Sequence, residues 1–220
     1  MTKVPEIVFW GATGQATVLH EAISQSAIRL VALIDNRNLE SPIHGVPVLR
    51  GEDGLEDLVC QYQKPEDLLF AVAVGGSRGR DRLALMESMR GRGLVPFTIV
   101  HRTAFVANDA SIGQACQILA MSAVCSCARL ETAVIVNTAA SIDHDCWISQ
   151  GAHIGPGARL AGEVFVGQRA FIGTGAIILP RIRIGDDSIV GAGSVVITDV
   201  PPRTTVVGNP ARPVGQGLPK

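Results

Sequence analysis

The sequence has few of the features that mark a membrane, secreted or nucleic-acid-binding protein. Its longest apolar run, LLFAVAV at residues 68–74, is too short to span a bilayer, and the N-terminal apolar run is too short for a signal peptide. Lysine and arginine form no block, and the formal net charge is -1 at pH 7. A general nucleic-acid or membrane-surface binder needs such a basic patch. We therefore expect a cytoplasmic protein whose ligands are small and neutral or singly anionic.

Cysteine and aromatic residues are also sparse. The 5 cysteines are odd in number and lack the spacing of a disulfide framework or a zinc site, so we expect reduced thiols and no bound metal. Cys125 and Cys127 are separated by a single residue and have no second pair to complete a metal site. Aromatic residues make up 4% of the chain, against 24 glycines, which predicts a core of aliphatic and small side chains.

The second half of the chain is built on a six-residue repeat. Every sixth residue from Val106 to Val196 is aliphatic, and a small side chain commonly follows four positions later. A helix needs apolar residues at i+3 and i+4 throughout, whereas short strands joined by tight turns satisfy a period of six with glycines inside it. Residues 101–220 are therefore predicted to form a parallel β-solenoid whose interior is lined by the aliphatic positions. The spacing alone leaves the handedness open, although parallel crossovers are usually right-handed.

The first hundred residues follow a different pattern. Residues 5–23, PEIVFWGATGQATVLHEAI, read as a buried strand, a glycine turn and a helix, and residues 28–36 supply a second strand that ends in Asp35. Residues 67–93 repeat the strand, glycine turn and helix, and residues 94–100 complete a small parallel sheet. Residues 1–100 are thus predicted to form an α/β Rossmann-like unit.

The first glycine turn is a candidate nucleotide site. Gly11 and Gly14 would let the backbone approach a phosphate at a helix N-terminus, where free N–H groups and the helix dipole favour an anion. Thr13 and Gln15 lie in the same turn, and Asp35 stands where a ribose-binding carboxylate would be. The turn is G-x-x-G rather than the full G-x-G-x-x-G, so a turn that only joins strand to helix is the alternative.

The tandem hexads, closed by VPPRTTVVGNPARPV at residues 200–214, resemble the hexapeptide-repeat acyltransferases. With the first unit included, the whole chain resembles the sugar acetyltransferases of the UDP-bacillosamine and GDP-perosamine N-acetyltransferase and sialic acid O-acetyltransferase family. The resemblance implies a left-handed β-helix with three hexads per coil, a homotrimer, a nucleotide-sugar-binding first unit, and coenzyme A along the solenoid at a subunit boundary. One departure is Gln15, where the family often has a histidine.

The stretch NTAASIDHD at residues 137–145 carries the chemistry that acetyl transfer needs. A base must take the proton of the attacking group, and a histidine beside a carboxylate suits that role because its ordinary pKa lies near 6.5. The stretch matches the family's active-site segment, and the resemblance implies His144 as general base, Asp145 as its orienting carboxylate and Asn137 as a sugar contact. His153 matches a second family histidine, near the acetyl group of coenzyme A. The plain alternatives are a capped turn histidine at 144 and a surface histidine at 153.

Coil arithmetic extends this candidate site. If three hexads form a coil, residues eighteen apart stack, so Gly162 would lie one coil beyond His144 and offer its N–H to the oxyanion. His153 would lie half a coil from His144, so that the two could meet only across a subunit boundary. In the closing stretch the resemblance implies that Ala192, Gly208, Pro210 and Arg212 contact coenzyme A, with the Arg212 guanidinium suited to a phosphate; coil termination by the prolines is the alternative.

Together with these features, the resemblance implies an acetyl-CoA-dependent N-acetyltransferase that acts on the C4 amine of a nucleotide-linked 4-amino-4,6-dideoxy sugar, either GDP-perosamine or a UDP-linked sugar, for polysaccharide biosynthesis. Sialic acid O-acetylation is the nearest rival, and a non-catalytic, nucleotide-sensing trimeric scaffold is another. A gamma-class carbonic anhydrase needs three zinc-binding histidines, which His144 and His153 do not provide. Sugar nucleotidyltransferases with hexapeptide tails carry a much larger first domain.

Overall fold

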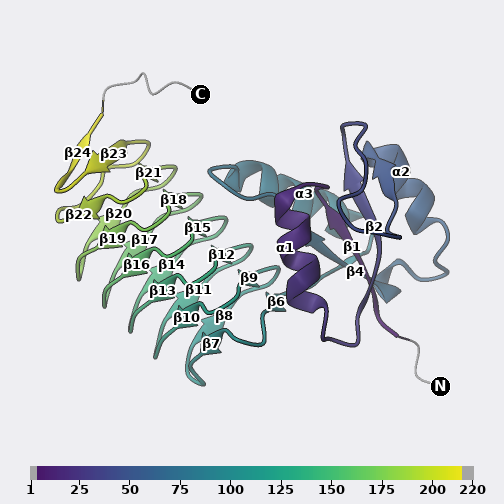
Figure 1. Cartoon of the computed structure of the whole chain (residues 1–220), viewed down its shortest axis with the longest axis horizontal. Helices are drawn as coiled ribbons and strands as arrows, with labels where there is room; N and C mark the ends of the chain where they lie inside the picture. The colour runs from purple at the N-terminus through teal and green to yellow at the C-terminus, as the bar shows by residue number, and fades with distance from the viewer. Residues whose placement is uncertain (1–3, 215–220) are drawn as a thin grey trace.

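The computed structural model describes residues 4–214, so the parts of the two predicted domains that fall on residues 1–3 and 215–220 lie outside the described residues. Two units follow one another along the long axis of the molecule, an α/β unit at the N-terminal end and a solenoid at the C-terminal end (Figure 1). This arrangement matches the predicted order of the two parts.

The α/β unit is a parallel five-stranded sheet with strand order β3-β2-β1-β4-β5. Its strands are β1 (Glu6–Trp10), β2 (Arg29–Asp35), β3 (Val48–Arg50), β4 (Leu68–Val72) and β5 (Val95–Pro96). Its helices are α1 (Gly14–Ile23), α2 (Gly51–Val59) and α3 (Gly79–Gly91), and a short 3₁₀ helix, η1, spans Pro65–Asp67. The predicted strand, turn and helix repeats are confirmed, whereas β3 and α2 were not predicted.

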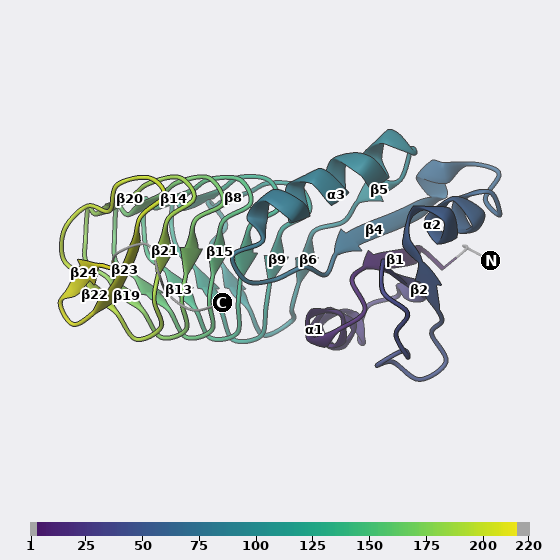
Figure 2. The ribbon, with the colours of Figure 1, turned by 90° about the horizontal axis from the view of Figure 1, so that it is seen from above.

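Alternation along β1 explains why the sheet is covered on both faces. Ile7 and Phe9 pack with α1 in one apolar cluster, whereas Val8 and Trp10 pack with α2 and α3 in another. Successive side chains of a strand point to opposite faces, and a strand apolar at every position is therefore buried on both. Figure 2 shows α1 and α3 on opposite sides of β4.

The solenoid has three faces, each a ladder of short strands. The docking face, which meets the α/β unit, contains β6 (Ile99–Val100), β9 (Gln117–Ile118), β12 (Ile135–Val136), β15 (His153–Ile154), β18 (Phe171–Ile172), β21 (Ile189–Val190), β23 (Thr205–Gly208) and β24 (Ala211–Pro213). The second face contains β7 (Phe105–Val106), β10 (Ala123–Val124), β13 (Ser141–Ile142), β16 (Arg159–Leu160), β19 (Ile177–Ile178) and β22 (Val195–Val196). The third face contains β8 (Ser111–Ile112), β11 (Arg129–Leu130), β14 (Trp147–Ile148), β17 (Phe165–Val166) and β20 (Arg183–Ile184).

Residues eighteen apart stack, as the hexad arithmetic predicts. Ser141 pairs with Arg159 and Trp147 pairs with Phe165, each one coil further along a parallel ladder. The second residue of each strand points inward with the small residue of the following turn, as Ile142 and Cys146 do, and both are buried in one continuous cluster. The ladder ends in the antiparallel pair β23–β24, which departs from the repeat.

The α/β unit and the solenoid are joined by more than the chain connection. Strand β6 pairs with β9, so that the docking face begins at Ile99, before the predicted boundary at residue 101. The N-terminal end of α3 lies against the solenoid, since a Cβ built on Gly79 would stand 2.3 Å from the carbonyl oxygen of Gly151. Among residues 4–214 no helix is both long enough and apolar enough to cross a membrane.

Candidate active site

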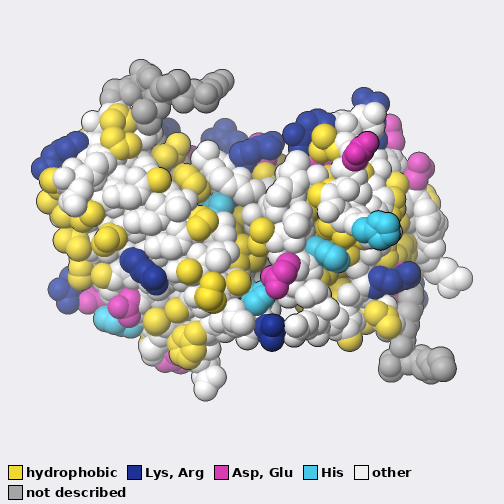
Figure 3. Space-filling view, viewed as in Figure 1, with side chains coloured by type: hydrophobic (Ala, Val, Ile, Leu, Met, Phe, Trp, Pro, Cys, Tyr) yellow, Lys and Arg dark blue, Asp and Glu magenta, His cyan; other side chains and the backbone are white. Residues whose placement is uncertain are grey.

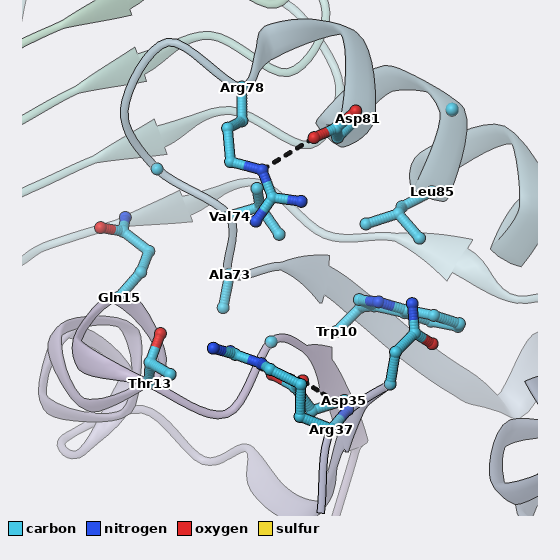
Figure 4. Close-up of a pocket in the computed structure, with 14 residues that line it drawn as sticks. Trp10, Thr13, Gln15, Asp35, Arg37, Ala73, Val74, Arg78, Asp81 and Leu85 are labelled. Carbon is cyan, nitrogen blue, oxygen red and sulfur yellow. Dashed lines mark hydrogen bonds and ion pairs between the residues drawn. The ribbon is translucent and has the colours of Figure 1, made fainter. Parts of the chain in front are cut away.

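A cavity of about 700 Å³ opens at the carboxyl ends of β1, β2 and β4. Gly11, Thr13, Gln15 and Asp35, all predicted from the sequence to bind substrate, are among the residues that line it (Figure 4). Gly14 is the first residue of α1, which begins at the same turn. This is the edge at which parallel α/β sheets usually bind ligands, because the turns that follow the strands converge there.

Gly11 makes the first turn possible. Its φ of +115° lies in the region that side chains avoid, and a Cβ would lie 2.4 Å from the carbonyl oxygen of Ala73. The chain therefore leaves β1 close beside the end of β4, and α1 starts with its free N–H groups at the rim of the cavity.

Asp35 is a buried carboxylate held by several donors. It accepts hydrogen bonds from the Ala12 N–H at 3.2 Å and from the Arg37 backbone N–H, Nε and Nη2, each at 3.0 Å. These Arg37 contacts hold the pKa of Asp35 below its ordinary value despite burial. Asp35 is thus a charged, fixed acceptor on one side of the cavity, and Arg78, paired with Asp81 at 2.7 Å, lies on the opposite side (Figure 4).

Gln15 connects the glycine turn to the solenoid. Its Nε2 donates to Oε1 of Gln117 at 2.7 Å, and the Gln117 Nε2 in turn donates to the carbonyl of Val72 at 2.7 Å. Gln117 lies on β9 of the docking face and is buried. The residue that departs from the family pattern therefore forms part of a hydrogen-bonded bridge between the two units.

His153 lies in the boundary between the units and is only 4% exposed. One ring nitrogen, Nδ1, is 3.2 Å from the carbonyl oxygen of Gly76, and the other, Nε2, is 3.0 Å from Nδ2 of Asn137. Phe171 packs edge-on against the ring at 5.3 Å between centroids. Desolvation, reinforced by the nearby Arg82 charge, lowers the pKa of His153 to about 4. The ring is therefore neutral near pH 7, and the alternative of a plain surface histidine is wrong.

His144 lies in the exposed turn after β13, with Nδ1 2.8 Å from Oδ2 of Asp145. That hydrogen bond, together with the charges of Asp143, Asp145 and Glu163, raises the pKa of His144 above its ordinary value. Because Nδ1–H donates to Asp145, the neutral ring carries its free lone pair on Nε2.

Gly162 stacks one coil beyond His144, at the place that coil arithmetic predicts. A Cβ built on Gly162 would lie 2.4 Å from Nε2 of His144, so the imidazole occupies the space that any side chain at 162 would fill. Within residues 4–214 the N–H of Gly162 makes no hydrogen bond. A basic nitrogen and an open backbone donor are thus neighbours.

The structure places the predicted site residues in three separate regions of the chain. Asn137 and His153 adjoin the α/β unit, whereas His144, Asp145 and Gly162 lie where the second face turns into the third. Besides His153 and Gly162, the residues predicted to contact coenzyme A are exposed in the last coil and the β23–β24 hairpin: Ala192, Gly208, Pro210 and Arg212. In the described part of the chain, His144 and His153 have no hydrogen-bond partner in common.

Several residues that shape the cavity were not predicted from the sequence. Trp10, Arg37 and Arg78 line it, and Arg82 lies buried behind it. The sequence did contain a sign of these cations near the cavity. LIDNR places Arg37 two residues after Asp35, and GSRGRDR places three arginines after the second glycine turn. No group of three or more His, Cys, Asp or Glu side chains within residues 4–214 is arranged to hold a metal ion.

Comparison with known proteins places these features in one family. The model of the bacterial transferase hexapeptide (six repeats) matches residues 163–198. A perosamine N-acetyltransferase variant from Caulobacter crescentus, solved in complex with CoA and GDP-perosamine, is 31% identical, with 97% of this chain and 99% of that chain covered and a TM-score of 0.90.

Two further solved structures have the same two-part fold. The acetyltransferase domain of PglB from Neisseria gonorrhoeae, in complex with acetyl coenzyme A, is 33% identical, with 96% of this chain and 100% of that chain covered and a TM-score of 0.86. WeeI from Acinetobacter baumannii is 25% identical, with 94% and 99% covered and a TM-score of 0.81. On the identity and coverage of these matches, together with the hexapeptide coils and the α/β unit, the chain belongs to the hexapeptide-repeat nucleotide-sugar acetyltransferases.

Proposed function

We propose that this protein is an acetyl-CoA-dependent N-acetyltransferase that acetylates the C4 amine of a nucleotide-linked 4-amino-4,6-dideoxy sugar. The observation that carries the proposal is the His144–Asp145 pair, whose Nε2 lies against Gly162. The relatives from Caulobacter crescentus and Neisseria gonorrhoeae, solved with GDP-perosamine and CoA or with acetyl coenzyme A, support the substrate class and the acyl donor.

The geometry suggests direct transfer. The sugar amine attacks the thioester carbonyl, and Nε2 of His144 takes the amine proton while Asp145 stabilises the imidazolium. The Gly162 N–H donates to the oxygen of the tetrahedral intermediate. When the intermediate collapses, the carbon–sulfur bond breaks and the imidazolium returns the proton to the departing thiolate of coenzyme A.

No acyl-enzyme is needed in this scheme, and the cysteine nearest the base is poorly suited to form one. Cys146 is buried inside the coil and its Sγ lies 3.2 Å from the carbonyl oxygen of Ala161. Desolvation raises the pKa of the Cys146 thiol to about 11, so that the nucleophilic thiolate is scarce at neutral pH.

The nucleotide would occupy the cavity beside Gly11. The N-terminus of α1 and the Arg37 and Arg78 side chains offer positive charge to a diphosphate, and Asp35 offers an acceptor to a ribose hydroxyl or a base N–H. The sugar would then extend toward Asn137 and His153, which adjoin the Gly75–Gly76 end of the cavity wall.

The working form would be a homotrimer of chains whose solenoids are left-handed β-helices. His144 belongs to a different corner of the solenoid from the one next to the chain's own cavity, so a neighbouring copy must bring a base to that cavity. The second face and the turns that follow it expose Phe105, Ile177, Leu179 and Ile197, an apolar surface that association would cover. Figure 3 shows hydrophobic side chains spread over the solenoid half of the molecule.

The test is a thiol-release assay with acetyl-CoA against UDP- and GDP-linked 4-amino-4,6-dideoxy sugars and free sialic acid. Turnover of one amino sugar that falls by about 10²-fold or more in His144→Asn is expected for a general base. His44→Asn, an exposed histidine outside both sites, is the matched control and should retain activity. Turnover of sialic acid alone would replace the proposal with O-acetylation, and no turnover at all would favour a binding scaffold.

A further inference from the structure

Arg82, on α3, is a buried cation without a carboxylate partner among residues 4–214. The residue is 1% exposed, and desolvation lowers its pKa to about 10, which still leaves the guanidinium charged at neutral pH. A buried charge is costly unless hydrogen bonds replace its water. The buried Arg82 charge therefore needs hydrogen-bond acceptors that replace its lost water.

Four backbone carbonyls supply that arrangement. Nη1 donates to Val74 at 2.9 Å and Nε donates to Ala133 at 2.9 Å, while Nη2 donates to both Gly151 and Ala152. Val74 follows β4 and lines the nucleotide cavity, whereas the other three residues belong to two successive coils of the solenoid. The guanidinium of Arg82 thus connects the wall of the cavity to the solenoid through three nitrogens. A lysine, with one nitrogen, could not reach all of these carbonyls.

The carbonyls of Gly151 and Ala152 immediately precede His153, whose tautomer the surrounding contacts define. The Oδ1 of Asn137 accepts from the Thr138 N–H at 2.8 Å, so that its Nδ2 is the atom facing His153. Nε2 of His153 must then accept that hydrogen bond, and Nδ1–H donates to Gly76. The ring links Asn137 to the cavity loop only while it is uncharged.

We propose that Arg82 is a positioning residue for the nucleotide-sugar pocket: it fastens the Val74–Gly76 loop to the solenoid and keeps His153 an uncharged acceptor for Asn137. The inference rests on the proposed function only in naming a nucleotide sugar as the ligand. A protonated His153 would present donors at both ring nitrogens, lose Asn137 and release the loop. Arg82 is the charged group that acts on His153, since Gly76, Asn137 and Phe171 around the ring are uncharged.

The first measurement is an NMR titration of the histidine ring signals, with the His153 signal identified by its loss in His153→Gln. In the wild-type protein His153 should remain neutral from pH 8 down to about 5, in line with its lowered pKa. Arg82→Met removes the charge and should move the titration of His153 upward, but by only part of the shift, because burial is the larger cause and remains. Arg82→Lys keeps the charge and should leave His153 neutral, and Arg80→Met, exposed on the same helix, should change nothing.

The second measurement is the KM for the nucleotide sugar as a function of pH. Arg82→Met cannot hold the loop and the solenoid together either, so it should raise KM at every pH; below the new pKa of His153 KM should rise about fivefold further, the effect of losing one hydrogen bond, with kcat less affected. Arg82→Lys should raise KM at every pH, because its single nitrogen cannot hold the loop and the solenoid together.

The outcomes separate this inference from the proposed function. A wild-type His153 that titrates near pH 6.5, or a titration that Arg82→Met leaves unmoved, would overturn the role of Arg82. Should Arg82→Met fail to fold, the KM of Arg82→Lys decides the question, because an unchanged KM in that variant would overturn the role of Arg82 in holding the loop. If no amino sugar is turned over, calorimetric binding of GDP and UDP replaces KM, and the same dependence on pH and variant is expected.

Discussion

Gly162 is the residue at which one added carbon would act most directly on the proposed base. A Cβ there would overlap Nε2 of His144 at 2.4 Å, and the neighbour is a mobile side chain rather than backbone. Gly162→Ala should therefore turn the imidazole away from Asp145 and lower kcat about 10- to 100-fold, in the range that misplacing a catalytic base costs. Thermal unfolding should change little. The steady-state assay is the check.

A double variant separates this steric effect from a general loss of structure. In His144→Ala the ring is gone, so adding Gly162→Ala should cost little further activity if the alanine acts only through the imidazole. If the double variant instead lost as much further activity as Gly162→Ala loses alone, the steric explanation would be contradicted. The alanine would then be acting on the Gly162 N–H or on the local coil.

Asp145 should set the acidic limb of the pH profile. The base works as neutral imidazole, and Asp145 raises the pKa of His144, so the rate should fall as pH drops through a value above 6.5. Asp145→Asn removes the main cause of that shift, and the limb should move to lower pH while the plateau also falls. The profile of kcat/KM against pH measures both, and an unmoved limb would show that another group controls it.

The contrast between the two histidines shows what sequence can provide at this scale. His144, Asp145 and Gly162 are related by neighbouring positions and by the coil period, so their arrangement could be predicted. The burial of His153 could not, because it depends on how α3 and the Gly76 loop pack on the docking face. No local pattern encodes that contact between distant segments.

At the scale of elements, the seating of α3 depends on Gly79. A Cβ at this position would lie 2.3 Å from the Gly151 carbonyl oxygen and 3.0 Å from the Cα of Arg169, both of them backbone atoms of the solenoid. Gly79→Ala should push the helix away and cost about 1–3 kcal/mol, the usual range for overpacking, which lowers Tm by roughly 2–4 °C per kcal/mol in a chain of this length. Differential scanning calorimetry would measure the shift.

Gly91→Ala is the matched control at the other end of the same helix. The added methyl there meets no atom within 4 Å, so its Tm should stay near that of the wild type. Equal losses at both ends would mean that something other than contact with the solenoid governs the result, because alanine has a higher helix propensity than glycine and would not by itself lower Tm. A loss at Gly79 alone supports close docking of α3.

The elements themselves were predictable to different degrees. The hexads predict their strands because the period is short and each coil repeats the same packing, as Ile142, Leu160 and Ile178 do. Strand β3 and helix α2 were missed because residues 36–67 carry no repeat and no glycine turn of the kind seen at Gly11. The antiparallel return of β24 was missed too, since it follows the last hexad.

On the scale of the whole molecule, activity should depend on association. Ile177→Glu places a charge on the exposed second face, which should dissociate the proposed trimer and abolish turnover, because each cavity would lose the His144 of its neighbour. Sedimentation velocity together with the activity assay checks both. Val95→Glu, exposed on the α/β unit, is the control, and an active Ile177→Glu monomer would contradict a shared site.

The stacked coils also fix the length of the solenoid in steps of one whole coil. Neighbouring strands in a sheet lie about 4.8 Å apart, so each coil adds that length and returns the chain to the same face. Duplicating one coil, for instance 179–196, would carry the β23–β24 hairpin about 4.8 Å further from His144 without altering either. Inserting one hexad instead would turn everything beyond it onto another face. The distance between His144 and the β23–β24 hairpin, along which an extended coenzyme A would lie in the proposed complex, can thus lengthen only by whole coils.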